Sequence, residues 1–348
     1  MINVLIVEDS PTVQELLRHI LSSDPGIQVV GVAGDGEEAL EFLQSHKSDL
    51  VTMDINMPRM NGLEATRRIM ETFPTPVLIV TGNSDPKEVE RSFNLLEMGA
   101  LAITGRPPGP GNPDYAAEAE KFIRLVKTLA EIRVVRRWPR EPFKMGRTRL
   151  PFPAISEPAD VGVIAIGAST GGPSVLKTIL SNLPAHFPIP VVIVQHITEG
   201  FLEGLVEWLN QTSRIQVRVA EHGEALLPGH AYLAPENQHL IVGPRGKALL
   251  TPGPHENSQR PSVSCLFRSV AQVFGEKAVG ILLTGMGSDG AEGLRMMREA
   301  GAVTIAQDEK SSVIYGMPKA ATALQAASYS LSPEGIVETL AELASRGR

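Results

Sequence analysis

Short apolar runs alternate with longer amphipathic segments along the first part of the chain. The amphipathic segments, such as 13–22 and 37–45, carry apolar residues at helical spacing. The apolar runs predict strands at 2–7, 27–32, 50–53, 77–80 and 100–103. Repeated strand–helix units form a parallel sheet with its functional site at the carboxyl ends of the strands. We therefore predict a doubly wound α/β domain over residues 1–130.

The same alternation returns later and predicts a second doubly wound parallel-sheet domain over residues 159–345. Its strands are expected at 161–166, 191–194, 216–219, 279–283 and 302–305. Within it, residues 229–253 mix short apolar runs with Pro and Gly, which predicts short antiparallel strands. We expect a small antiparallel hairpin there, attached to the α/β fold.

Residues 131–158 differ from both domains and predict an interdomain linker. The run RRWPREPFKMGRTRLPFP is rich in Pro and Arg, and residues 131–149 hold seven basic and two acidic side chains. A basic run can bind nucleic acid, and this one contains the aromatic residues Trp138 and Phe143, but a charged run is more often a solvated segment. We therefore favour a solvated linker.

Composition narrows the class of protein. The formal net charge is −7, which argues against a dedicated nucleic-acid binder. A single cysteine, Cys265, excludes an internal disulfide and fits a reducing compartment. We expect Cys265 to be a packed, inert thiol. The N-terminus does not resemble a signal peptide, and no apolar run approaches the roughly 20 residues of a membrane span. We expect a cytoplasmic protein with no membrane insertion.

Acidic side chains follow two of the predicted strands in the first domain. Glu8 and Asp9 follow the first strand and Asp54 follows the third, while Thr81 ends the fourth and Arg106 comes after the fifth. A lone Asp at a strand end usually caps the next turn. Three acids meeting at one sheet edge instead need a compensating cation, and carboxylate oxygens suit Mg²⁺. An Asp beside Mg²⁺ can also act as a nucleophile toward a phosphoryl group.

The stretches LIVEDSPTVQELL and LVTMDINMPRMNGLEATRRIM resemble a response regulator receiver domain, which has a flavodoxin-like fold. The resemblance implies that a histidine kinase phosphorylates Asp54. It also implies that Glu8, Asp9, Asp54 and the backbone carbonyl of Asn56 hold Mg²⁺, with Thr81 as the switch hydroxyl.

The chain departs from the receiver pattern at two positions. Arg106 stands where receivers carry a lysine, and its planar guanidinium is not equivalent to a compact ammonium. Ile103 stands where many receivers have an aromatic switch residue. Both departures bear on how strongly phosphorylation is transmitted.

Three residue types typical of hydrolases follow strands of the second domain. Ser169 lies in the glycine-rich turn GASTGG, His196 follows the next strand, and Asp289 lies in the turn TGMGSDG. At one sheet edge, Ser169 would attack, His196 would take its proton and Asp289 would orient the imidazole. Each residue alone has a simpler role in a cap or turn. A nucleotide site is the alternative, but neither turn has the required glycine and lysine spacing.

Six motifs of the second domain resemble the chemotaxis response regulator protein-glutamate methylesterases, the CheB family. They are IGASTGGP, VIVQHI, GHAYLAP, RPSVSCLFRSVA, ILLTGMGSDGAEGL and AGAVTIAQDEKSSVIYGMPKAA. The resemblance implies hydrolysis of glutamate γ-methyl esters on methyl-accepting chemoreceptors, often with glutamine deamidation. It assigns Ser169, His196 and Asp289 as the triad, with the N–H groups of Thr170 and Met286 near the oxyanion.

The resemblance also implies a regulated enzyme without a cofactor for its ester chemistry. The receiver would cover the esterase cleft until Asp54 is phosphorylated. After His196 the family usually has prolines before Gly-Phe, whereas this chain has Thr198-Glu199-Gly200-Phe201, a difference that bears on receptor docking. We expect a monomer. The alternative is a phosphorylation-controlled adaptor that binds receptors with weak or no esterase activity.

Overall fold

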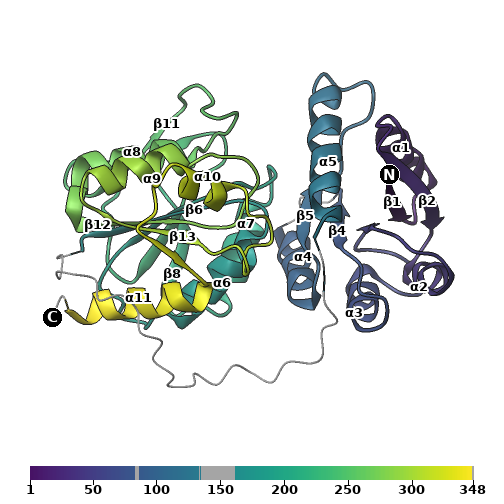
Figure 1. The fold of residues 1–348 in the computed structure, drawn as a ribbon, viewed down its shortest axis with the longest axis horizontal. Coiled ribbons are helices and arrows are strands. Elements are labelled where there is room, and N and C mark those ends of the chain that lie inside the picture. The colour runs from purple at the N-terminus through teal and green to yellow at the C-terminus, as the bar shows by residue number, and fades with distance from the viewer. Residues whose placement is uncertain (83–85, 133, 135–160, 347–348) are drawn as a thin grey trace. The chain divides into compact units, whose positions relative to one another are not determined.

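The computed structural model describes residues 1–82, 86–132, 134 and 161–346 (Figure 1). The predicted linker over 131–158 lies almost wholly outside these residues. The chain divides into two compact units, Met1–Leu150 and Pro151–Arg348. Each unit is a parallel α/β fold, as the alternation of strands and helices predicts.

The N-terminal unit has a five-stranded parallel sheet in the order β2-β1-β3-β4-β5. The strands are β1 (Ile2–Val7), β2 (Ile27–Ala33), β3 (Leu50–Met53), β4 (Val77–Thr81) and β5 (Ala102–Gly105). The helices are α1 (Pro11–Ser22), α2 (Gly36–Ser45), α3 (Gly62–Thr72), α4 (Pro86–Met98) and α5 (Tyr115–Ala130). Helices α1 and α5 pack on one face, and α2, α3 and α4 pack on the other.

The central strands of this sheet read as unbroken apolar runs because helices cover both of their faces. Val4 to Val7 of β1 and all of Val77–Thr81 are buried. The strand order reverses between β1 and β3, where the connections leave in opposite directions. The carboxyl ends of these two strands therefore border the crevice in which α/β folds place their ligands.

The C-terminal unit contains a seven-stranded sheet in the order β14-β13-β12-β6-β7-β9-β8, with every neighbouring pair parallel. Its strands are β6 (Val163–Ala168), β7 (Val191–Gln195), β8 (Gln216–Val219), β9 (His230–Leu233), β12 (Ala278–Leu282), β13 (Val303–Gln307) and β14 (Tyr329–Leu331). A separate antiparallel hairpin joins β10 (His239–Gly243) to β11 (Lys247–Thr251).

Helices cover both faces of this second sheet (Figure 1). One face carries α8 (Val263–Phe274), α9 (Ala291–Glu299) and α10 (Met317–Ala323). The other carries α6 (Gly172–Asn182), α7 (Leu202–Asn210) and α11 (Pro333–Arg346). A single 3₁₀ turn, η1 (Gly275–Lys277), links α8 to β12. The largest side chain buried in this unit is Trp208 of α7.

The predicted fold differs from the structure in several details. Residues 230–233 join the main sheet as parallel strand β9 instead of pairing antiparallel, because three of these four residues are buried between neighbouring strands. The predicted strand at 100–103 lies two residues later, at Ala102–Gly105, since Ala100 continues the turn that leaves α4. The strand predicted at 161–166 also lies two residues later, at Val163–Ala168, because its pairing with β7 extends to Ala168. The prediction lacks strand β14, because this short and partly exposed edge strand has no clear apolar run.

Among the residues that the structure describes, no helix is both long and apolar enough to cross a bilayer.

Asp35 provides a test of helix capping in the N-terminal unit. Its buried carboxylate accepts the N–H groups of Glu37 and Glu38 at the start of α2 and pairs with Arg59. We expect Asp35→Ala to lower the free energy of unfolding of this unit by about 1–2 kcal/mol, the usual effect of losing a cap. Hydrogen–deuterium exchange of the α2 amides measures the change.

Ser10→Ala is the matched control, because Ser10 occupies the same position before α1 but its side chain makes no capping bond. We expect this variant to leave exchange in α1 nearly unchanged. Equal effects of the two substitutions on their helices would contradict the capping role of Asp35.

Candidate functional site

The three proposed triad residues follow neighbouring strands at the reversal point of the second sheet. Ser169 follows β6, His196 follows β7, and Asp289 lies in the turn after β12. β6 pairs with β7 on one side and with β12 on the other. The register places Ala168 opposite Gln195 and Gly167 opposite Leu282, so the three strands end together. The topology thus brings the three turns to one edge of the sheet.

His196 and Asp289 are in direct contact. Nε2 of His196 lies 3.0 Å from Oδ2 of Asp289, and both side chains are largely buried. Because Nε2 is engaged, Nδ1 is the ring nitrogen left to exchange a proton with another group. This contact is compatible with the predicted role of Asp289, which is to orient the imidazole.

The start of α8, the loop before it and the turn of Asp289 itself surround the carboxylate of Asp289 with hydrogen-bond donors. Oδ2 accepts the N–H of Val263 at 2.7 Å. Oδ1 accepts the hydroxyls of Ser262 and Ser264 at 2.9 and 2.7 Å, and the side-chain amide of Asn257 at 3.0 Å. The N–H groups of Ser264 and Gly290 complete the set.

This surrounding keeps Asp289 ionised. Burial alone would raise the pKa of the carboxyl group. The hydrogen bond and charge of His196, with the bonds from Ser264 and Asn257, outweigh burial and hold the pKa of Asp289 well below its usual range. The negative charge that an imidazolium would need is therefore present throughout the neutral range.

Backbone contacts fix the turn that carries Ser169. The N–H of Ser169 donates to the carbonyl of Thr284, and the Thr284 hydroxyl donates back to the carbonyl of Thr170. Gly285 packs so closely that a Cβ on it would lie 2.6 Å from Cβ of Ser169. Only glycine allows the two turns to approach this far. Within the described residues, the hydroxyl of Ser169 makes no hydrogen bond to His196.

Two backbone N–H groups at this edge remain available as donors. The N–H groups of Thr170 and Met286 make no hydrogen bond within the part of the chain that the structure describes. Thr170 follows Ser169 directly, and Met286 follows the Gly285 that packs against Ser169. Free donors from two adjacent turns are the arrangement that stabilises an oxyanion.

Several residues of this site are absent from the sequence-based prediction. Asn257, Ser262 and Ser264 bind Asp289, and the side-chain amide of Gln195 donates to the carbonyls of both Ser169 and His196. The motif RPSVSCLFRSVA contains both serines, but nothing in its pattern indicates that they bind Asp289. The buried Gln195 could have been found only from its position, because it directly precedes His196 in the sequence.

Cys265 lies in α8 with its thiol 3.0 Å from a carboxylate oxygen of Glu256. Burial, and then the bond and charge of Glu256, raise the pKa of the thiol to about 11. The thiol therefore stays protonated at neutral pH, which agrees with the inert role expected for it.

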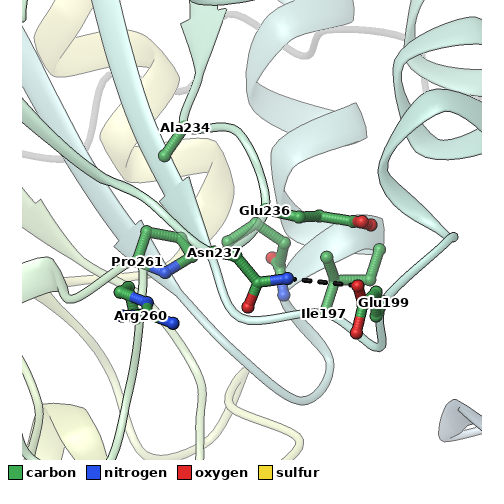
Figure 2. Close-up of a pocket in the computed structure, with 8 residues that line it drawn as sticks. Ile197, Glu199, Ala234, Glu236, Asn237, Arg260 and Pro261 are labelled. Carbon is green, nitrogen blue, oxygen red and sulfur yellow. Dashed lines mark hydrogen bonds between the residues drawn. The ribbon is translucent and has the colours of Figure 1, made fainter. Parts of the chain in front are cut away.

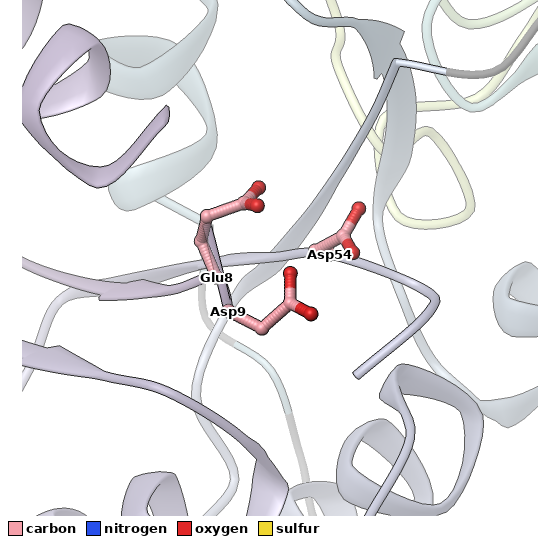
Figure 3. A group of neighbouring side chains, drawn as sticks. All are labelled: Glu8, Asp9 and Asp54. Carbon is pink, nitrogen blue, oxygen red and sulfur yellow. The ribbon is translucent and has the colours of Figure 1, made fainter. Parts of the chain in front are cut away.

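The three acids of the N-terminal unit gather at the ends of β1 and β3. One carboxylate oxygen from each of Glu8, Asp9 and Asp54 lies within 4.8 Å of the others (Figure 3). Glu8 and Asp54 are buried, and Asp9 is exposed. The backbone N–H of Asn56 donates to Asp54 at 3.2 Å, which places Asn56 beside the same cluster.

The charges of this cluster are poorly compensated by the protein. Burial, followed by the charge of Asp54, raises the pKa of Glu8 to about 7, although Arg106 partly opposes this. Burial also raises the pKa of Asp54 above its usual value, against the N–H groups of Ile55 and Asn56. Three hard oxygen donors at one place, two of them on acids with raised pKa values, fit a site for a divalent cation such as Mg²⁺.

The other predicted receiver residues lie around this cluster. Thr81 is buried at the end of β4, and its carbonyl accepts the N–H of Arg106 at 2.9 Å. The guanidinium of Arg106 reaches Glu8, with Nη2 3.2 Å from Oε2. Arg106 thus delivers its charge to the acids despite standing in the lysine position. Ile103 is half-buried on β5.

Each of the two units matches a known protein family. The response regulator receiver domain matches residues 4–102, and the CheB methylesterase domain matches residues 164–340. The chain belongs to the CheB methylesterase family, a family of ester hydrolases, and carries a receiver domain ahead of its methylesterase domain.

Individual relatives match nearly the whole chain. A protein-glutamate methylesterase/protein-glutamine glutaminase of Geobacter metallireducens is 53% identical over 99% of both chains. One from Nitrosospira multiformis is 50% identical over 100% of this chain and 98% of its own. The crystal structure of the Thermotoga maritima CheB methylesterase catalytic domain is 37% identical, with a TM-score of 0.51, and covers 53% of this chain and 98% of its own.

The raised pKa of Glu8 predicts that Mg²⁺ affinity depends on pH. Below about pH 7 a proton occupies Glu8 in the free protein, and Mg²⁺ must displace it. We expect affinity to rise between pH 6 and pH 8, by up to about tenfold for each pH unit below that pKa. Calorimetric titration in buffers of different ionisation enthalpy measures both the affinity and the released proton.

Glu8→Gln should weaken Mg²⁺ binding and remove its pH dependence in this range. Glu41→Gln is the matched control, because Glu41 is an exposed glutamate on α2. A wild-type affinity that does not change over the same pH range would refute the role of Glu8.

Proposed function

We propose that this chain hydrolyses glutamate γ-methyl esters on methyl-accepting chemoreceptors and deamidates receptor glutamines. Residues 159–345 carry the chemistry, and residues 1–130 form a receiver that a histidine kinase phosphorylates at Asp54. The observation that carries the proposal is the buried contact between His196 and Asp289 beside the glycine-rich turn of Ser169. The names of the full-length relatives support the choice of substrate.

In the proposed reaction, Oγ of Ser169 attacks the ester carbonyl while Nδ1 of His196 takes the hydroxyl proton. The N–H groups of Thr170 and Met286 bind the resulting oxyanion, at about 3–4 kcal/mol for each donor. The tetrahedral intermediate then collapses and methanol leaves with the proton from His196. For a glutamine substrate, ammonia leaves instead.

The second half of the reaction uses the same groups. A water molecule gives a proton to His196 and attacks the acyl-enzyme, and the Ser169 oxygen leaves with that proton. The products are a glutamate carboxylate and the free enzyme. Asp289 stays ionised throughout and stabilises the imidazolium, for which its low pKa suits it.

In the receiver, we propose that Glu8, Asp9, Asp54 and the carbonyl of Asn56 hold Mg²⁺. The ion would supply the positive charge that a phosphoryl group needs at Asp54. The carboxylate of Asp54 attacks the phosphoryl group of a phosphodonor, and the donor's leaving group departs. Thr81 and Arg106 are the groups placed to respond, and phosphorylation raises the esterase activity.

Ser169→Ala tests the nucleophile. We expect it to lower methanol release from methylated receptor by at least about a thousandfold, because no other side chain replaces the attacking oxygen. Gas chromatography of released methanol measures the rate. Ser181→Ala, at the far end of α6, is the matched control and should keep full activity.

Retained hydrolysis in Ser169→Ala would refute the triad. If wild-type protein binds receptor but releases no methanol, the chain is an adaptor instead.

Asp54→Ala tests the switch. With a small-molecule phosphodonor and Mg²⁺, the wild type should release methanol faster than without the donor. In Asp54→Ala the donor should have no effect, because the carboxylate that accepts the phosphoryl group is gone. Asp49→Asn, an exposed acid that precedes β3, is the control and should respond like the wild type. Undiminished stimulation in Asp54→Ala would refute the phosphorylation site.

A further inference from the structure

The side-chain amide of Gln195 connects the two turns that carry Ser169 and His196. Its Nε2 donates to the carbonyl of Ser169 at 2.9 Å and to the carbonyl of His196 at 2.8 Å. Because both partners are carbonyl oxygens, only the NH₂ group of the amide can face them. The direction of the amide is therefore fixed by its partners, and both of its hydrogens are in use.

These bonds continue the pairing of two strands past the point where their backbones separate. β6 and β7 pair as far as Ala168 and Gln195, and the N–H of His196 donates to the carbonyl of Ala168. A pocket borders the end of β7, with Gln195 and Ile197 in its wall (Figure 2). The turn of His196 is thus not packed against protein on every side, so hydrogen bonds contribute more to its position.

The carbonyl of Ser169 belongs to the same peptide plane as the N–H of Thr170. The bond between these residues is trans, so its C=O and N–H groups point in opposite directions. The carbonyl accepts the Gln195 amide and also the N–H of Gly172, which lies 2.8 Å away. Two donors on the carbonyl hold the plane, and they leave the Thr170 N–H pointing away from them. This N–H is the one that binds the oxyanion in the proposed reaction.

The oxygen of the Gln195 amide indicates that stability alone does not explain this residue. Among the residues that the structure describes, Oε1 is buried without a hydrogen-bond partner. It lies against Gly172, where a Cβ would come within 2.3 Å of it. A buried amide oxygen without a partner is unfavourable, and an apolar side chain of the same shape would avoid that cost. Such exceptions to the usual pairing of buried polar groups are typical of functional positions.

We propose that Gln195 is a positioning residue that directs the N–H of Thr170 toward the oxyanion. Through the same amide it keeps the turn of Ser169 at its working distance from His196. The inference rests on the proposed function, because the oxyanion forms on the ester that Ser169 attacks. The amide acts through two backbone carbonyls, so it stabilises the transition state, in which the oxyanion is present, and not the bound ester.

Gln195→Met tests this inference, because methionine has a similar length and shape but no amide donors. Methanol release from methylated receptor and nitrophenolate release from 4-nitrophenyl acetate are measured side by side. In the second assay Oγ of Ser169 attacks the acetyl carbonyl, 4-nitrophenolate leaves, and His196 takes the hydroxyl proton. We expect kcat for methanol release to fall about ten- to a hundredfold, with KM within about twofold, because a misdirected oxyanion donor loses part of its effect. Nitrophenolate release should fall by a similar factor.

Gln195→Glu adds a measurement that a purely structural role would not affect. An ionised carboxylate would face the same two carbonyls with no hydrogen to donate, whereas a protonated one donates a single O–H. Burial raises the pKa of such a carboxyl group. We therefore expect the rate of this variant, relative to the wild type at the same pH, to rise as the pH falls from about 8 to about 6. The relative rate of Gln195→Met should stay constant over this range.

Gln216→Met is the matched control, because Gln216 is an exposed glutamine at the start of β8 and should keep wild-type rates. Gly172→Ala is an independent test that leaves Gln195 unchanged. Gly172 does not have a positive φ, so alanine suits the backbone, but the added Cβ would displace the amide oxygen. Its kcat should fall as in Gln195→Met, and the double variant should be slower than Gln195→Met by no more than about twofold.

Wild-type kcat in folded Gln195→Met would overturn this inference and leave the proposed function standing. An unchanged kcat in Gly172→Ala would do the same, and this variant decides the matter if neither substitution of Gln195 folds. If the wild type releases no methanol from methylated receptor, the proposed function falls, and nitrophenolate release still decides the role of Gln195. A wild type that reacts with neither ester would overturn both.

Discussion

The buried carboxylate of Asp289 binds several segments of the C-terminal unit together at the candidate site. An ionised acid with only 3% of its surface exposed is stable only if donors replace the water it has lost. The start of α8, the turn around Asn257 and the imidazole of His196 all supply such donors. The charge of Asp289 therefore connects the start of α8, the turn around Asn257 and the proposed proton acceptor His196.

The acids of the receiver illustrate the opposite use of burial. Glu8 and Asp54 are also buried at strand ends, yet their pKa values rise instead of falling. Burial raises both pKa values and the charges of neighbouring acids add to the rise, while the few N–H donors and Arg106 only partly oppose it. The protein itself supplies all the donors that stabilise the negative charge of Asp289. The receiver acids, by contrast, are stabilised most by a cation or proton from solution. The first arrangement suits steady catalysis, and the second suits a switch.

The two units show that a shared topology can serve different chemistry. Each is a doubly wound parallel sheet whose candidate site lies where the strand order reverses. What differs is the residue that ends each strand. Acids follow β1 and β3 in the receiver, whereas Ser169 and His196 follow β6 and β7 in the catalytic unit. Function therefore follows from a few positions at the sheet edge.

The order of apolar runs and helical segments was enough to predict both parallel sheets, and the turns after their strands pointed to Ser169, His196, Asp289 and the receiver acids. Those features are local, because burial on both faces imposes continuous apolar strands. Only the tertiary structure placed His230–Leu233 in the main sheet and brought Asn257 and Ser262 onto Asp289. These outcomes depend on contacts between segments far apart in the chain, for which hydrophobic periodicity holds no information.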